Sequence, residues 1–203
     1  MTERPFDLGP MPAGHRVRTV DTRVVNAPME RIFELARSVE HWPAHLSHYR
    51  WVNVRDRRSD GGGVVTMAAR RPFGPLGWPV WWVAQMQVRE GSDQGPAIRF
   101  RHIDGVTRGM EVEWSFTPAR QPFAPSAESS ATLVQIVHVW DGPAWPLIGA
   151  VAATHVIGPV FVHGIASRTL AGLSRAAEAS AAYRAPSVAR EAALTGITDR
   201  RGV

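Results

Sequence analysis

The C-terminal run from Gly158 to Ala182 constrains the fold most, because it predicts one long helix with a single apolar face. Pro159 suits the first turn of a helix, where its missing N–H costs nothing. Apolar and small residues then recur at helical spacing on one side, namely Phe161, Ile165, Gly172, Leu173 and Ala176. No helix of similar length is predicted elsewhere, so this face must be buried against a sheet.

The chain before this run is rich in predicted strands. They are expected at Val17–Val25, Tyr49–Arg55, Val64–Arg70, Val80–Arg89, Ile98–Ile103, Thr107–Phe116 and Ala131–Trp140. Glycine-containing turns at 60–63 and 104–105 join successive strands as hairpins. The clearest alternation places Met110, Val112, Trp114 and Phe116 on one face of a strand and Glu111 and Glu113 on the other, solvated face.

Two short helices are expected between the first two strands. Asn26 and Pro28 mark the start of the first helix, and the second covers Val39–Ser47 with a break near Pro43. The predicted class is therefore α+β, with a curved antiparallel sheet of about seven strands wrapped around a long C-terminal helix, a helix-grip arrangement. We expect a flexible arm at 1–14, one domain at 15–183 and a disordered tail at 184–203.

Composition excludes several classes of protein. The chain has no cysteine, which excludes disulfides and cysteine-ligated metals. All 23 basic Lys+Arg residues are arginine and the net charge is +5, but the arginines are scattered and no nucleic-acid motif accompanies them. We expect no nucleic-acid partner. The first residues lack the apolar core of a secretory signal, and the composition is typical of a GC-rich bacterial genome, so we expect a cytoplasmic bacterial protein.

An apolar segment, Trp145–Ile157, precedes the long helix. His155, Gly158 and Pro159 interrupt it before it reaches the length of a membrane span. We interpret it as a lid over a ligand site or as a surface for transient contact with lipid.

The segment Val24–Tyr49 resembles the START/Bet v 1-like superfamily, in particular the polyketide cyclase/dehydrase and aromatase/cyclase group. A capping residue with proline, an apolar helix, Trp42-Pro43 and a tyrosine seven residues after the tryptophan form the shared pattern. Arg70-Arg71-Pro72 and the terminal helix also match, so that the resemblance covers about Val17–Ala182.

The resemblance implies a hydrophobic cavity in which a poly-β-ketone, bound to an acyl carrier protein, undergoes aldol cyclisation and dehydration, as in antibiotic biosynthesis. It implies catalysis without cofactor or metal. The family's tryptophan, tyrosine and arginine fall on Trp42, Tyr49 and either Arg70 or Arg71. A gap-free alignment favours Arg70, whereas aligning the proline favours Arg71. We expect Arg70 to stabilise a developing oxyanion and Tyr49 to orient the substrate or relay a proton.

Strand periodicity supplies further candidates for the cavity. His102 shares a face with Ile98 and Phe100 and is the best candidate for general acid/base chemistry. His155 and His163 could also reach the cavity. The predicted substrate-binding residues are Trp42, Arg71, Trp82, Met86, Phe100, Trp114, His138, Phe161 and Ile165. For each of them, ordinary packing in the core is the competing interpretation.

Two alternatives remain at this stage. His41, His45 and His48 recur at helical spacing, which would suit zinc, but Pro43 interrupts the helix and no carboxylate is fixed nearby. We therefore expect no metal. For function, the alternative to the cyclase is a non-catalytic carrier of a lipid or quinone, and homodimer formation is left open.

Overall fold

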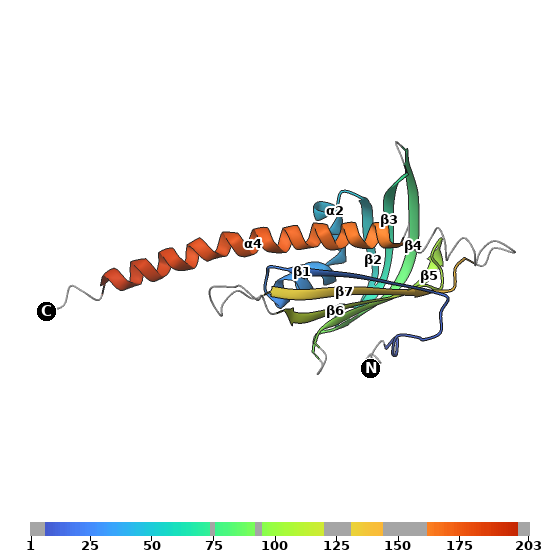
Figure 1. Ribbon diagram of the computed structural model, residues 1–203, viewed down its shortest axis with the longest axis horizontal. Helices are drawn as coiled ribbons and strands as arrows, with labels where there is room; N and C mark the ends of the chain where they lie inside the picture. Colours follow the sequence, from blue (N-terminus) through green and yellow to red (C-terminus); the bar gives the residue numbers. More distant parts are fainter. Residues whose placement is uncertain (1–6, 74–75, 92–94, 120–130, 144–161, 199–203) are drawn as a thin grey trace.

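The computed structural model describes residues 7–73, 76–91, 95–119, 131–143 and 162–198. Seven strands form one antiparallel sheet in the order β1-β7-β6-β5-β4-β3-β2, so that β1 and β2 are its edges. Their bounds are β1 Val17–Val25, β2 Tyr49–Arg57, β3 Gly63–Phe73, β4 Leu76–Arg89, β5 Ala97–Gly105, β6 Glu111–Ala119 and β7 Ala131–Trp140. The predicted fold class is confirmed, since the long helix lies along one face of this sheet (Figure 1).

The helices are α1 Met29–Arg37, the 3₁₀ turn η1 Val39–His41, the short α2 Trp42–His45 and the long α4 His163–Thr198. The second predicted helix is thus divided into η1 and α2. Pro43 lies within the first turn of α2, where a proline is tolerated, and so it marks a helix start rather than a break. α4 continues to Thr198, through most of the range in which a tail was predicted, and its C-terminal part projects beyond the sheet (Figure 1).

The strand predicted at Thr107–Phe116 begins later, at Glu111. Residues 106–109 form a turn instead, in which the amide of Gly109 donates to the carbonyl of His102 at 2.8 Å. Gly109 has a φ of 85°, which glycine adopts without the steric cost of a Cβ. The alternation itself is confirmed, because Met110, Val112, Trp114 and Phe116 are all buried.

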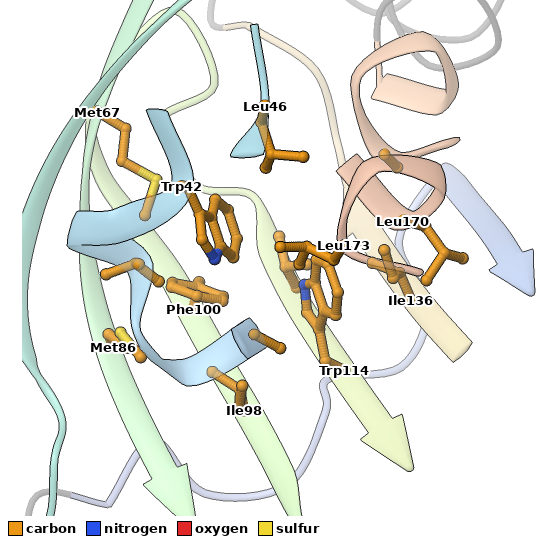
Figure 2. Close-up of a cluster of buried hydrophobic side chains, with 14 of the residues drawn as sticks. Trp42, Leu46, Met67, Met86, Ile98, Phe100, Trp114, Ile136, Leu170 and Leu173 are labelled. Atoms are coloured by element: carbon orange, nitrogen blue, oxygen red, sulfur yellow. The ribbon is translucent and has the colours of Figure 1, made fainter. Parts of the chain in front are cut away.

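The core lies between the sheet and the helices. Alternate side chains of the central strands point to α1, α2 and α4, and Figure 2 shows Trp42 close to Phe100, and Trp114 close to Leu173 of α4. Gly172 permits this packing, because a Cβ at this position would lie 2.2 Å from Cδ2 of Leu46. The absence of a side chain therefore sets how closely α4 approaches the end of α2.

The outer face of the sheet is partly covered by the N-terminal residues. Arg99 is fully buried there and donates to the carbonyl of Gly9 at 2.6 Å and to the carboxylate of Glu111 at 2.8 Å. Arg101 donates to the carbonyl of Leu8 at 3.0 Å. The interpretation of Glu111 as a solvated residue is wrong, because its side chain is buried and pairs with Arg99 and Arg101. Within the expected arm, Leu8 and Gly9 are thus hydrogen-bonded to sheet side chains.

Candidate functional site

Five aromatic side chains meet on the inner face of the sheet, and we call them the aromatic cluster: Trp42, Tyr49, Trp82, Phe100 and Trp114. The ring centroid of Trp42 lies 5.2 Å from that of Tyr49 and 5.7 Å from that of Trp114. Tyr49 in turn lies 6.1 Å from Trp82. Such edge and tilted contacts are favourable for aromatic rings, so that the cluster forms one continuous surface.

Separate elements supply these rings. Tyr49, Trp82, Phe100 and Trp114 come from β2, β4, β5 and β6, which the sheet brings together on one face. Trp42 begins α2 and is fixed by a hydrogen bond of 3.1 Å from its indole N–H to the carbonyl of Leu35. This bond satisfies its polar atom, so the ring can present its apolar surface to the cluster.

All five rings of the aromatic cluster are buried, and their exposed fractions differ little from those of the surrounding core. Tyr49 and Trp82 are 6% and 7% exposed, whereas Phe116 and Leu173 elsewhere in the interior are at 0%. Phe33, an aromatic residue of the core outside the cluster, is 8% exposed, so the cluster is enclosed to the same degree as other aromatic side chains.

His102 adds a polar group to the aromatic cluster. Its ring stacks on Trp82, and its Nδ1 lies 2.6 Å from the hydroxyl oxygen of Thr107 in the following turn. Burial lowers the pKa of His102 to about 3, and the nearby His138 acts in the same direction. The imidazole is therefore neutral at pH 7.

His138 on β7 is a second neutral imidazole. Its Nδ1 lies 3.3 Å from the hydroxyl oxygen of Thr19, its partner in the β1–β7 register. Burial lowers the pKa of His138 to about 3. Two uncharged imidazoles thus lie on neighbouring parts of the inner face.

Tyr49 is neutral for a related reason. Burial raises the pKa of its phenol well above the ordinary value, so the hydroxyl keeps its proton. The neighbouring His48 ring lies 4.8 Å away, and its Nε2 is 3.0 Å from the hydroxyl oxygen of Thr169 on α4. Burial, with the cation of Arg168, lowers the pKa of His48 to about 4.

These groups can hydrogen-bond to oxygen atoms of a ligand without carrying charge. The phenol of Tyr49 is a donor, and a neutral imidazole such as that of His102 offers one donor and one acceptor nitrogen. In surroundings from which water is largely excluded, such bonds are stronger than in water. The arrangement therefore suits a mainly hydrophobic molecule that carries carbonyl or hydroxyl groups.

Most other predicted site residues have defined positions. Met86 is buried beside Phe100, and the two are partners in the β4–β5 register. Ile165 on α4 packs against the core while remaining partly exposed. Phe161 lies outside the described residues, as do His155 and the segment Trp145–Ile157.

Arg70 lies away from the aromatic cluster. Met67 and Ala69 of β3 are in the core, whereas Arg70 follows them on the opposite face and is exposed. Its guanidinium stem passes over Gly77 of β4, where a Cβ would lie 2.1 Å from Nε of the arginine. Arg71 occupies the register position opposite Trp78, two residues beyond Ala69.

His163, which the sequence named as a residue that could reach the cavity, forms a polar pair that was not predicted. Asp21 on β1 is 5% exposed, and its Oδ1 lies 2.6 Å from Nδ1 of His163, the first residue of α4. Burial raises the pKa of Asp21, while the interaction with His163 opposes that rise. Its spacing of four from Val17 and Val25, both buried, is the signal that could have revealed it.

No group of three metal-ligating side chains occurs within the ranges that the structure describes. His41 and His45 are exposed and His48 bonds to Thr169, so these three do not form a site together. Within the same ranges, no helix is long and apolar enough to cross a membrane.

A curved antiparallel sheet packed against one long C-terminal helix is the helix-grip fold, as in START/Bet v 1-like proteins. Comparison with known families agrees. The chain belongs to the polyketide cyclase / dehydrase and lipid transport family, whose sequence profile matches residues 25–156.

Solved structures show the same fold at low sequence identity. A protein from Thermus thermophilus is 18% identical with a TM-score of 0.57, covering 80% of this chain and 98% of its own. A START superfamily protein from Mycobacterium smegmatis is 17% identical, with a TM-score of 0.55 and coverages of 84% and 99%. The Zhui aromatase/cyclase from a Streptomyces species is 15% identical, with a TM-score of 0.57 and coverages of 82% and 94%. No curated protein matches the sequence.

Proposed function

We propose that the protein is a cofactor-independent cyclase that binds a poly-β-ketone against the aromatic cluster and promotes its aldol cyclisation and dehydration. The observation that carries this proposal is the pair Tyr49 and His102, both of which contact Trp82. A carrier of hydrophobic ligands needs the aromatic surface, but it does not need two proton-transfer groups in contact with the same indole.

The proposed reaction divides between these two groups. His102 accepts a proton from the carbon between two carbonyls, and the resulting enolate carbon attacks a second carbonyl of the same chain. A carbon–carbon bond forms, and the oxygen of the attacked carbonyl, hydrogen-bonded by Tyr49, takes up the proton that His102 accepted, so that the imidazole returns to its neutral form. Loss of that hydroxyl with a neighbouring C–H proton releases one water and leaves a double bond.

The indoles contribute by selecting a folded conformer of the substrate. Trp42, Trp82 and Trp114 present flat apolar surface, against which an extended chain must bend to bury its carbons. When the site holds the two reacting carbons together, it removes the entropic cost of bringing them into contact, which a free polyketone in solution must overcome. Arg70 has no part in this proposal, because it lies on the outer face.

Reconstitution tests the proposal. A minimal polyketide synthase is supplied with the purified protein, and the products are separated by liquid chromatography with mass detection. We expect a cyclised, dehydrated product that is reduced at least tenfold by Tyr49→Phe or His102→Gln. The control is Val24→Ser on the outer face of β1, where the native side chain is 50% exposed. The same products without the protein would refute the proposal.

A second candidate is a non-catalytic carrier of a lipid or quinone. It is favoured by the neutral character of the site, since none of the described arginines lies over a ring of the aromatic cluster. Native mass spectrometry of protein purified from its own host distinguishes the two. A bound lipid or quinone, together with no effect on polyketone products, supports the carrier.

A further inference from the structure

Two large aromatic side chains are exposed on the outer face of the sheet. Trp51 of β2 is 40% exposed and Trp81 of β4 is 50% exposed. Ala68 of β3 is the register partner of both, so the backbones of the two tryptophans are about 10 Å apart with the alanine midway. We call these three residues the tryptophan patch.

The tryptophan patch is separate from the aromatic cluster. Val52 and Trp82, the chain neighbours of Trp51 and Trp81, are buried in the core, so the exposed indoles point to the opposite side of the sheet. No ligand on the inner face can contact them.

Part of the outer face beside these tryptophans is covered by the N-terminal residues. Over β4 and β5, Leu8 and Gly9 are hydrogen-bonded to the side chains of Gln87, Arg99 and Arg101. The tryptophan patch lies beside this covered region. Large exposed aromatic surface of this kind is typical of interaction sites.

The charge around the tryptophan patch is mainly positive. Arg70 follows Ala68 by two residues on the same face, and Arg50 directly precedes Trp51; both are exposed. Neither side chain forms an ion pair with any carboxylate of the described residues. Asp104 of β5, the register partner of Val83, is an exposed acidic residue. Its Oδ1 accepts a hydrogen bond of 2.8 Å from the amide of Gly105.

We propose that the tryptophan patch is the docking surface for an acidic protein partner that places an apolar side chain between the two indoles. Tryptophan and arginine are among the residues most enriched at the positions that dominate binding energy in protein interfaces. The guanidinium groups of Arg50 and Arg70 would then pair with carboxylates of the partner.

A lipid bilayer fits this surface less well. Asn53 and Asp56 of β2 are exposed along the same edge strand, and a flat bilayer that covered Trp51 would have to desolvate them too. A protein covers the indoles alone and leaves such groups in water at the rim.

The test uses an acyl carrier protein as the probe, a choice that rests on the proposed function. Binding is measured by calorimetry at 50 mM and 300 mM salt with the full chain. We expect micromolar binding, at least fivefold weaker at the higher salt, and a further loss of at least tenfold in Trp51→Ser/Trp81→Ser. Arg50→Glu/Arg70→Glu should give a similar loss, which keeps the test valid if the serine variant is unstable. The control is Val20→Ser/Val24→Ser, which removes exposed apolar surface from β1.

The outcomes separate this inference from the proposed function. If the variants lose binding to the carrier protein but turn over a free polyketone as the native protein does, both the inference and the proposed function are supported. If the variants lose binding to the carrier protein and the native protein shows no turnover of a polyketone, the inference is supported and the cyclase proposal is overturned. Equal weakening by the β1 variant, absence of carrier-protein binding, binding to anionic vesicles instead, or self-association through the patch in sedimentation would each overturn the inference.

Discussion

The imidazole of His102 lies parallel to the indole of Trp82, with ring centroids 5.8 Å apart and 8° between the ring planes. This stacking places an imidazole against the aromatic surface that the proposed ligand would share. The hydroxyl of Thr107 holds the ring at Nδ1. An imidazole fixed by both contacts is positioned before any ligand arrives, which reduces the cost of ordering it later.

Replacement of Tyr49 by phenylalanine tests whether its phenol acts on the reaction or only packs. The ring contacts with Trp42 and Trp82 are kept, so we expect the Kd for a polyketone analogue to change by less than about threefold. Without the donor, kcat should fall by about 10²-fold, in the range usual for loss of one proton-transfer group. Kinetics and fluorescence titration measure the two quantities. An equal rise in KM at constant kcat would assign Tyr49 to binding alone.

The buried histidines predict a loss of stability in acid. The pKa values of His102 and His138, about 3 in the folded protein, lie below the ordinary value of 6.5, so the unfolded chain binds more protons between these limits. The free energy of unfolding should therefore be fully present above pH 6.5 and fall as pH decreases towards 3. Each histidine contributes at most about 1.4 kcal/mol per pH unit.

Urea unfolding at pH 7, 6, 5 and 4 measures this dependence. The variant His102→Gln/His138→Gln removes both groups, and it should show a shallower fall than the native chain. A native and a variant curve with the same slope would show that the imidazoles are already hydrated or charged in the folded state.

The buried ion pair between Arg99 and Glu111 predicts that Glu111→Gln lowers the free energy of unfolding strongly, although the two side chains have almost the same size. Arg99 is fully buried, so Glu111→Gln leaves its guanidinium with Glu113 at 3.8 Å and the carbonyl of Gly9. Breaking a buried pair in this way should cost about 3 kcal/mol of unfolding free energy. The control is Arg89→Gln, which breaks a more exposed pair with Glu113 and should cost less than about 1 kcal/mol. Similar costs for both variants would contradict the burial of Arg99.

At Gly172, we expect replacement by alanine to lower the free energy of unfolding, which is the opposite of its usual effect in a helix. In an exposed helix, glycine to alanine stabilises by about 1 kcal/mol. At Gly172 the new Cβ would lie 2.2 Å from Cδ2 of the buried Leu46, so we expect Gly172→Ala to destabilise by about 1–3 kcal/mol. Ala179→Gly, at an exposed position of α4, calibrates the helix preference in the same urea assay. Stabilisation by Gly172→Ala would show that α4 can move away from α2.

The elements of this fold could be predicted because their patterns are local. β1 and β7 have the predicted bounds, since continuous alternation of side chains ends there at polar or turn residues. The boundaries that differ depend on contacts elsewhere. Residues 106–109 have strand-like composition but form a turn, held by the bond from Gly109 to His102 on the neighbouring strand.

The candidate site could be predicted only in part. Trp42, Tyr49, Trp82, Phe100 and Trp114 were named from the sequence, and the structure brings them into contact. The face on which Arg70 lies depends on which residues of β3 point into the core. Because the motif contains two adjacent arginines, the sequence alone does not reveal which of them shares the core-facing side. Asp21 was missed because its partner, His163, lies more than a hundred residues away along the chain.

By itself, the sequence determined the class of fold, the order of its elements and the set of rings available for a site. These follow from periodicity and from the apolar face of one helix, which local residues encode. The tertiary structure alone decided which side chains are neutral, which arginine is buried and which tryptophans face water. Charge state and exposure depend on what every other part of the chain places around a residue, and register and close packing supply those surroundings.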